Sequence, residues 1–253
     1  MKRFATPGIM LRRIDYGDYD LICTFYTKTF GKQTAMAKSA KRSVKRFGGS
    51  LELFSIVNIT CRAGRGKGLP YLEEAALIEP FMAIRSDIRK TAYASYWVEL
   101  VDKWSEAGVA HEPTFSLLAR ALAELNGDRT MAAVISIWFQ MNFMKLAGFG
   151  PTLSECSLCH NLLEQIDGAK IRFDLKRGGL VCNRCAELAG GGPNLAKGVI
   201  KQLLWIGGRD LETARRMRFS AQGLVEGLHF LEAFVPFHLD KEPRSLKFLK
   251  QVR

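Results

Sequence analysis

Four of the six cysteines restrict the fold of this chain more than any other feature of its sequence. Cys156 and Cys159 form one Cys-x-x-Cys pair, and Cys182 and Cys185 form a second pair after a gap of 22 residues. Two residues between thiolates let both sulfur atoms of a pair turn toward one point, and two such pairs complete a tetrahedron with Zn–S distances of about 2.3 Å. The spacing therefore predicts a closed, structural zinc site, with one Zn²⁺ per chain.

The segment between the two pairs has the pattern of a β-hairpin. "IRFDL" (171–175) alternates, "KRGG" can turn, and "LVC" starts a return strand, which together predict a zinc ribbon. Disulfides are an alternative that a reducing compartment disfavours, and a redox Cys-x-x-Cys motif belongs at a helix start in a βαβ unit. A rubredoxin-type iron site has no supporting feature. Because four sulfurs leave no position for water, we expect no catalytic metal.

The N-terminal region has the alternating pattern of short strands separated by Gly-rich turns. Five strands of this kind are typical of a small closed barrel, for which an OB-fold is the most economical interpretation and an SH3-like barrel the alternative. Cys23 and Cys61 lie in apolar strand patterns and are expected in the core. The expected strands cover residues 8–15, 21–28, 33–40, 50–61 and 69–78.

From residue 81 the apolar period changes to about four residues, which indicates amphipathic helices. The first helix is expected to end at Gly108, and the next to begin at "EP" (112–113) and stop at Gly127. Thr130, Asn194 and Ser220 are the expected N-caps of three further helices. The sequence thus predicts an α+β multidomain protein: an OB-fold barrel (1–80), a helical domain (81–153 and 194–240), an embedded zinc module (154–193) and a basic tail (241–253).

The chain lacks a stretch with the composition of a signal peptide or a membrane span. Its most apolar segment, residues 131–150, contains Gln140, Asn142 and Lys145, which favours a buried helix. We therefore expect a cytoplasmic protein.

The positive charge of the chain, +12 with a pI near 9.6, is concentrated at its two ends. Residues 1–80 carry 14 Lys/Arg against 7 Asp/Glu, residues 194–253 carry 11 against 6, and the segments between them are neutral. The densest stretch, "AKSAKRSVKRFGG" (37–49), has five cations and no anion. A concentrated cationic field attracts a polyanion, so this distribution favours a nucleic-acid surface.

The basic stretches fall in loops of the predicted barrel. Barrels of this class hold single strands between cations on the phosphates and aromatic rings under the bases, so binding is expected to depend strongly on salt and little on sequence. Phe25, Tyr26 and Phe47 are the candidates for base stacking. The predicted DNA-binding cations are Arg12, Arg13, Lys28, Lys32, Lys38, Lys41, Arg42, Lys45, Arg46, Arg62, Arg65 and Lys67.

The motifs that would indicate an enzyme are incomplete. "GRGKG" (64–68) lacks the spacing of a phosphate-binding loop, and "HEP" (111–113) lacks the second histidine of a zinc protease. A nuclease would need acidic Mg²⁺ ligands near the basic surface, and residues 21–51 contain no Asp or Glu. The remaining alternative is a zinc-stabilised regulator that reads particular DNA or RNA sequences and would show marked sequence preference.

The chain resembles the RecO family of bacterial recombination mediators. The resemblance lies in "GIMLRRIDYGDYDLICTFYTKTFGKQTAMAKSAKRS", "LELFSIVNI", "YLEEAALIEPFMAIRSDIRKTAYASYWVEL", "GFGPTLSECSLCH" and the paired cysteine motifs, in an order that spans nearly the whole chain. Ser39 departs from the family pattern, in which "AKGA" has glycine at this position. Some members of the family lack the cysteines, which implies that the metal serves the fold.

The resemblance implies a non-enzymatic protein of DNA repair and recombination in the RecF pathway. It implies binding to single- and double-stranded DNA, annealing of complementary strands and, with RecR, loading of RecA onto strands covered by single-strand-binding protein (SSB). The implied partners are DNA, RecR and the acidic, hydrophobic C-terminal tail of SSB, with RecA engaged indirectly and no membrane. The implied location is the cytoplasm, at the nucleoid. Arg215, Arg216 and Arg218 are candidates for contact with the SSB tail or with DNA.

Overall fold

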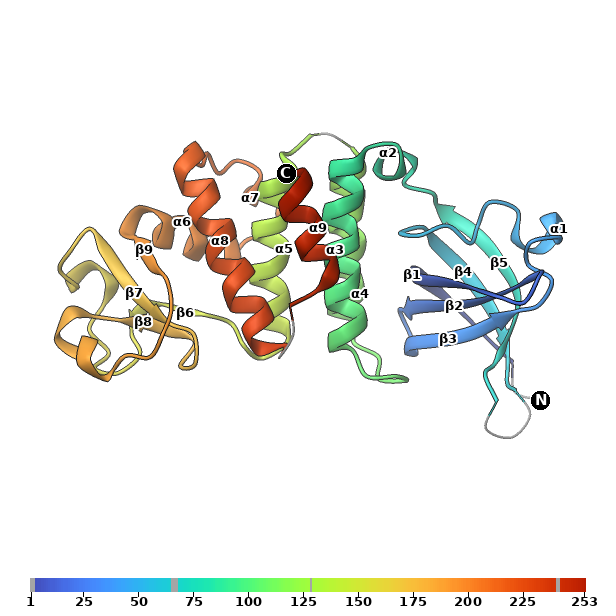
Figure 1. Ribbon diagram of the computed structural model, residues 1–253, viewed down its shortest axis with the longest axis horizontal. Helices are drawn as coiled ribbons and strands as arrows, with labels where there is room; N and C mark the ends of the chain where they lie inside the picture. Colours follow the sequence, from blue (N-terminus) through green and yellow to red (C-terminus); the bar gives the residue numbers. More distant parts are fainter. Residues whose placement is uncertain (1–2, 65–67, 128, 240–241) are drawn as a thin grey trace. The chain divides into compact units, whose positions relative to one another are not determined.

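The computed structural model describes residues 3–64, 68–127, 129–239 and 242–253, which group into two compact units (Figure 1). Unit 1 comprises residues 1–127 and 247–253, and unit 2 comprises residues 128–246. Unit 1 begins with a strand-rich barrel followed by helices, and unit 2 combines helices with a small sheet. The predicted α+β class is confirmed.

Five strands close into a barrel in the order β1-β2-β3-β5-β4. β1 is long enough to pair antiparallel with β4 through residues 3–9 and with β2 through residues 8–16. The closure between β3 and β5 is the weakest part of the barrel, because these strands pair in parallel at Met36 and Tyr71 alone. The strands are β1 (Arg3–Tyr16), β2 (Asp20–Thr27), β3 (Gly31–Ala37), β4 (Ile56–Arg62) and β5 (Tyr71–Glu79).

Two strands of the structure, β3 and β4, differ in their bounds from the strands predicted at residues 33–40 and 50–61. β3 stops at Ala37, and a turn leads from it into the short helix α1 (Val44–Phe47). Residues 50–55 form a loop before β4, because Phe54 adopts a left-handed backbone with φ of 73° that cannot continue a strand. Leu51 and Phe54 are nevertheless buried, which explains why the loop has the alternating apolar pattern of a strand.

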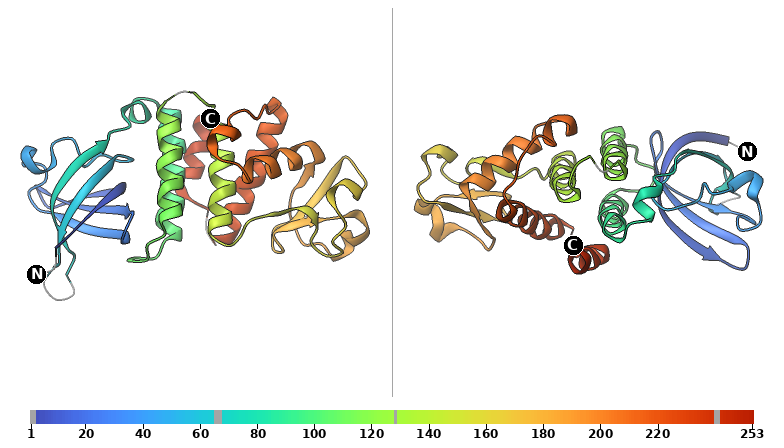
Figure 2. Two further views of the ribbon diagram at one scale, coloured as in Figure 1. Left: turned by 180° about the vertical axis from the view of Figure 1, so that it is seen from behind. Right: turned by 90° about the horizontal axis from the view of Figure 1, so that it is seen from above.

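The helices of unit 1 follow the barrel as α2 (Met82–Arg85), α3 (Ile88–Trp104) and α4 (Glu112–Asn126), and α3 and α4 lie side by side next to it (Figure 2). α4 begins with proline in its first turn and ends before Gly127, as predicted. α3 ends at Trp104 instead of Gly108, because the following residues run along β3, where the N–H of Gly108 donates to the Lys32 carbonyl at 3.0 Å.

The helices of unit 2 pack around α5, which is buried on most sides, as its apolar composition predicts. Ser220 caps α8 as predicted and accepts a hydrogen bond from the N–H of Gly223 at 3.0 Å. The other two predicted caps are wrong: α5 begins after Met131, and Asn194 pairs with Arg172 in a sheet. The bounds are α5 (Ala132–Leu146), α6 (Lys197–Gly207), α7 (Leu211–Ala214) and α8 (Ala221–His238), and the last helix, α9 (Arg244–Val252), has residues in both units.

The second sheet, in unit 2, has the strand order β6-β8-β7-β9. The predicted hairpin is confirmed as the antiparallel pair β7–β8. The ring of Phe173 on β7 packs edge-on against Phe230 and Phe234 of α8, which fixes the sheet on this helix. The strands are β6 (Thr152–Cys156), β7 (Lys170–Asp174), β8 (Gly179–Val181) and β9 (Asn194–Ala196), with 3₁₀ segments at Leu163–Gln165 and Asn183–Leu188.

Within the described ranges, each helix is too short or too polar to cross a lipid bilayer.

Candidate metal centre and nucleic-acid interface

The four predicted metal ligands come together in the β6–β9 sheet. Cys156 ends β6, Cys159 lies in the turn that follows, and Cys182 and Cys185 follow β8. Their sulfur atoms all lie within 4.8 Å of one another, and Cys159 and Cys182 are 3.6 Å apart. A tetrahedral Zn–S₄ centre needs sulfur separations of about 3.8 Å. The cluster therefore fits one metal ion with four sulfur ligands.

The backbone around Cys156 favours a thiolate at this residue. Burial acts to raise the pKa of Cys156, but hydrogen bonds from the backbone N–H groups of Cys182, Cys159 and Leu158 outweigh it and lower the pKa to about 6. His160 lies beside the cluster, and its Nδ1 is 2.8 Å from the Glu155 carboxylate, which raises the pKa of the imidazole. His160 is thus held by Glu155 and is not among the four ligands.

The cations at the end of β3 form an exposed group that we call the α1 surface: Lys38, Arg42, Lys45 and Arg46. Lys38, Arg42 and Lys45 are exposed, and Arg46 is half-buried. In the described part of the chain, the four side chains have no carboxylate within ion-pair distance, and the hydrogen-bond acceptors of the half-buried Arg46 are neutral, so the positive charge of the group is not neutralised. Such a surface can bind phosphate groups.

A compact turn holds the α1 surface in place. Ser39 has φ of 52°, and its N–H donates to the Asp20 carboxylate at 2.7 Å. The Arg46 guanidinium donates to the Lys38 carbonyl at 2.8 Å and to the Ser43 hydroxyl at 2.9 Å. Phe47 anchors α1 in the barrel core. The turn therefore presents the cations from a fixed backbone.

Two tyrosines that the sequence did not single out lie against these cations. The Arg42 guanidinium is 3.2 Å from the centre of the Tyr19 ring. Lys38 Nζ is 5.0 Å from the centre of the Tyr71 ring, and the Arg62 guanidinium is 5.6 Å from it. Tyr71 reaches Lys38 through the parallel pairing of β5 with β3, a long-range contact that leaves no signal in the sequence.

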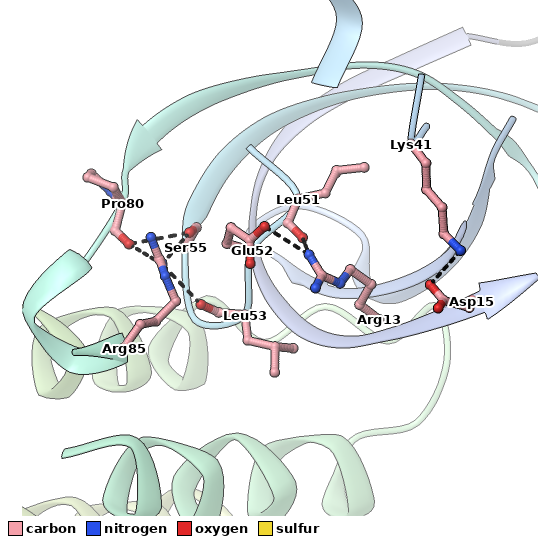
Figure 3. A network of polar contacts seen from close by, with 9 residues as sticks. All are labelled: Arg13, Asp15, Lys41, Leu51, Glu52, Leu53, Ser55, Pro80 and Arg85. Atoms are coloured by element: carbon pink, nitrogen blue, oxygen red, sulfur yellow. Dashed lines mark hydrogen bonds and ion pairs between the residues drawn. The ribbon is translucent and has the colours of Figure 1, made fainter. Parts of the chain in front are cut away.

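Two predicted cations lie beside the same barrel end but pair with carboxylates (Figure 3). Arg13 Nη1 is 2.9 Å from a Glu52 carboxylate oxygen and also donates to the Leu51 carbonyl. Lys41 Nζ is 3.2 Å from the Asp15 carboxylate. Because both pairs are solvent-exposed, each contributes less than about 1 kcal/mol, so a phosphate group can displace the carboxylate.

Arg85 has a structural role that the sequence analysis did not predict. Its guanidinium donates to the carbonyls of Leu53 and Pro80 and to the Ser55 hydroxyl (Figure 3). Together with Arg13 it holds the loop 50–55 between the barrel and α2.

Lys28 and Lys32 lie at the opposite end of β2 and β3 from the α1 surface, so the structure does not bring them together with the other predicted DNA-binding cations. Lys28 Nζ is 2.9 Å from Glu112 on α4, and Lys32 Nζ donates to the Asp102 carbonyl on α3 at 2.5 Å. Strands of seven or eight residues separate these lysines from the α1 surface by about 20 Å. Both lysines connect the barrel to the helices.

The remaining predicted cations have separate environments. Arg12 is exposed on β1 without an ion pair in the described chain, and Arg62 ends β4 with its Nε 2.9 Å from Glu73. Arg65 and Lys67 lie outside the described residues.

The prediction that Phe25, Tyr26 and Phe47 stack on bases is wrong, because all three side chains belong to the core. Phe25 is 0% exposed, Tyr26 1% and Phe47 4%. β2 is buried on both faces: Phe25 points into the barrel, and the Tyr26 hydroxyl lies 3.4 Å from the His111 carbonyl beside α4. Their rings are not accessible to a base.

The arginines 215–218 lie in the connection between α7 and α8 and not on a helix. Arg215 pairs with Glu212, and all three arginines are exposed.

Comparison with known proteins agrees with this architecture. Residues 1–81 match the family model "Recombination protein O N terminal", and residues 85–247 match "Recombination protein O C terminal". The chain is 45% identical to the DNA repair protein RecO of Desulfatibacillum aliphaticivorans, over 100% of this chain and 98% of that protein.

Further relatives carry the same name. The DNA repair protein RecO of Desulfosudis oleivorans is 40% identical, over 100% of this chain and 99% of its own. That of Syntrophus aciditrophicus is 34% identical, over 98% of this chain and 95% of its own. The matches cover both units, and the chain therefore belongs to the RecO family of DNA repair proteins.

Proposed function

We propose that this chain is a non-enzymatic mediator of recombinational repair that binds single- and double-stranded DNA through the α1 surface. Membership of the RecO family supports a role in DNA repair and recombination. The proposed activities are annealing of complementary strands and, with RecR, loading of RecA onto SSB-covered single strands.

The α1 surface is the observation that carries the proposal. Its four cations, three exposed and one half-buried, have no acidic partner in the described chain and stand on one end of a five-stranded barrel, which we interpret as an OB-fold. Cations that neutralise phosphates release counterions and reduce the repulsion between two DNA strands. Lower repulsion lowers the barrier to pairing, so annealing needs no covalent step.

The test is an annealing assay with fluorescently labelled complementary strands. The double variant Arg42→Glu/Lys45→Glu is expected to slow annealing at least about tenfold at low salt, because it replaces two attractive charges with repulsive ones. The matched control is Lys170→Glu/Lys176→Glu, which changes the charge equally at exposed positions of unit 2. Equal rates for the α1 variant and wild type, with circular dichroism showing a folded protein, would contradict the proposal.

We further propose that the cysteine cluster holds Zn²⁺ and that the metal stabilises the β6–β9 sheet. Four closely spaced sulfurs suit Zn²⁺ in a closed tetrahedral site, which supplies folding energy and no open coordination position. Metal analysis of the purified chain is expected to find one zinc per chain. Chelation is expected to increase hydrogen exchange in residues 152–196 and to leave the barrel strands protected. Iron in place of zinc, or unchanged exchange after chelation, would contradict this proposal.

The SSB tail has two candidate sites in unit 2. One is the arginine group at 215–218, and the other is a cavity of about 340 Å³ with an apolar lining that includes Met141, Pro151 and Leu204 beside Lys145. An acidic, hydrophobic peptide suits the cavity better, because the arginine group offers charge alone. Binding of an SSB-tail peptide is therefore expected to be weakened by Lys145→Glu and retained by Arg216→Glu/Arg218→Glu; the reverse result would assign the tail to the arginines.

A further inference from the structure

A second cavity, of about 570 Å³, opens beside the α1 surface at the seam between β3 and β5. Lys38, Arg46 and Arg62 line it together with Tyr71 and Glu73. Its volume falls in the range of pockets that hold small molecules, about 300–1,000 Å³. The cavity lies beside the single pairing position of these two strands, Met36 with Tyr71.

Tyr71 is the aromatic ring of this cavity. It is half-buried at the first position of β5, and buried Leu72 fixes the strand that carries it in the barrel core. Lys38, in the turn after β3, and Arg62, at the end of β4, approach the ring at the distances of 5.0 Å and 5.6 Å given above. The ring therefore has a fixed position beside the cavity with both cations over it, and a base reaches the ring when the exposed Lys38 side chain turns from the ring toward a phosphate.

The charge of the lining is net positive. Glu73 is the single carboxylate of the described lining, and it is engaged by Arg3 and Arg62. Lys38 and Arg46 have no carboxylate partner in the same region: Lys38 lies over the Tyr71 ring, and Arg46 donates to the neutral Ser43 hydroxyl and Lys38 carbonyl, so the charge of both is available to an anionic ligand. An accessible aromatic ring beside two such cations matches a flat, apolar group that carries negatively charged phosphates.

We propose that this cavity binds one unpaired nucleotide, with its base against Tyr71 and its flanking phosphates on Lys38 and Arg46. A base inside a duplex is stacked and paired and cannot enter, whereas a single strand can turn one base into the cavity. The inference rests on the proposed DNA binding and deepens it: the cavity selects single strands. Pairing of the strand removes the ligand of the cavity, so duplex formation weakens binding and favours release of the annealed product.

The test compares Tyr71→Ala, Tyr71→Phe and the control Tyr16→Ala, a substitution of an exposed tyrosine that does not line the cavity. Affinity is measured by fluorescence anisotropy for a thymidine oligonucleotide and for a hairpin duplex. Tyr71→Ala is expected to weaken single-strand binding about tenfold, in line with loss of one stacked base, and to change duplex binding less than about twofold. Tyr71→Phe and Tyr16→Ala are expected to keep wild-type affinity for both.

Equal weakening for both kinds of DNA, or unchanged single-strand affinity, would overturn the nucleotide site while leaving the proposed function intact. Failure of the wild-type chain to bind either DNA would instead contradict the proposed function. A second measurement needs no variant: an oligonucleotide with iodouracil in place of thymine is photo-crosslinked to the wild-type chain. The expected cross-link is in the peptide that contains Tyr71, and a cross-link elsewhere on the barrel would also overturn the site.

Discussion

At the scale of single residues, Ser39 shows how the sequence shapes the proposed DNA surface. The serine adopts the left-handed backbone that glycine favours, with φ of 52°. The hydrogen bond from its N–H to Asp20 holds this conformation in the turn that carries Lys38 and Arg42. A left-handed backbone costs a non-glycine residue about 1 kcal/mol.

We therefore expect Ser39→Gly to raise the free energy of unfolding by about 0.5–1 kcal/mol, because strain is relieved by more than the entropy that glycine adds to the unfolded chain. The measurement is urea denaturation followed by circular dichroism. The control is Ser43→Gly, at a φ of −100° that serine adopts without strain, and it should lower stability or leave it unchanged. Destabilisation by Ser39→Gly would show that the turn is not strained.

Asp174 is a buried carboxylate that stabilises the small sheet through its charge. Its oxygens accept hydrogen bonds from the backbone N–H groups of Arg177 at 3.0 Å and Gly190 at 2.7 Å. Burial acts to raise its pKa, but these N–H groups, that of Lys176 and the Arg177 charge outweigh it, so the pKa lies below the ordinary value of 3.8. The carboxylate therefore stabilises the fold above the unfolded-state pKa, and this contribution is lost as the pH falls through the lowered pKa.

Asp174→Asn is expected to destabilise unit 2 by about 1–3 kcal/mol at neutral pH, since an amide replaces an ionised acceptor of two backbone hydrogen bonds. The stability difference between wild type and variant should shrink as the pH is lowered below 3.8. Thermal denaturation over a series of pH values measures it. A difference that stays constant down to low pH would mean that the charge of Asp174 is not the stabilising feature.

The residues of the two candidate sites differ in how well the sequence predicts them. The cysteine spacing identifies all four members of the cysteine cluster, because the geometry within each Cys-x-x-Cys pair is local. The stacking candidates fail at Phe25 and Tyr26, because alternation does not reveal that β2 is covered on both faces. Tyr71 is missed, because its proximity to Lys38 depends on the pairing of distant strands.

At the scale of secondary-structure elements, the junction between β3 and the segment after α3 decides how the barrel meets its helices. Gly31 has φ of 61°, and a Cβ atom there would lie 1.9 Å from the Val109 carbonyl oxygen. Gly17, in the turn between β1 and β2, has nearly the same φ of 58° but has no atom within 4 Å of such a Cβ. Substitution of Gly17 therefore tests the cost of backbone strain alone, and substitution of Gly31 tests backbone strain together with a steric clash.

Gly17→Ala is expected to lower the free energy of unfolding by about 1 kcal/mol, through backbone strain alone. Gly31→Ala is expected to lower it by about 3 kcal/mol or more, because the methyl group also displaces the backbone at residue 109. Chemical denaturation of both variants is the measurement. Equal losses would show that the contact between β3 and residues 107–109 contributes little to stability.

The elements themselves follow from the sequence where local signals act alone. The proline start and glycine end of α4 and the serine cap of α8 are confirmed, because each depends on neighbouring residues. The predicted start of α6 at Asn194 is wrong, because Asn194 pairs in the sheet with Arg172 on β7, a partner that is distant in sequence. The predicted end of α3 at Gly108 is wrong for a similar reason, because Ala107 pairs with Lys32 on β3.

At the scale of the whole molecule, the cations of residues 1–80 fall into groups that make different contacts. Lys28 and Lys32 connect the barrel to α3 and α4, and Arg13 and Lys41 pair with carboxylates beside the loop 50–55. Among the described residues, the cations of the α1 surface have no carboxylate partner, so their charge is available to an anionic binding partner. Net charge predicts a polyanion partner, but it does not predict which cations the fold uses for its own contacts.

The most direct test of the account is the salt dependence of single-strand binding. Each phosphate contact contributes about −0.7 to the slope of log K against log salt concentration, so replacement of Lys38, Arg42, Lys45 and Arg46 with glutamine should reduce the slope by about 3. Replacement of the four exposed or half-exposed cations Lys170, Arg172, Lys176 and Arg184 in unit 2 should leave it unchanged. A wild-type slope in the α1 variant, or an equal reduction in the control, would contradict the claim that the α1 surface binds the DNA backbone.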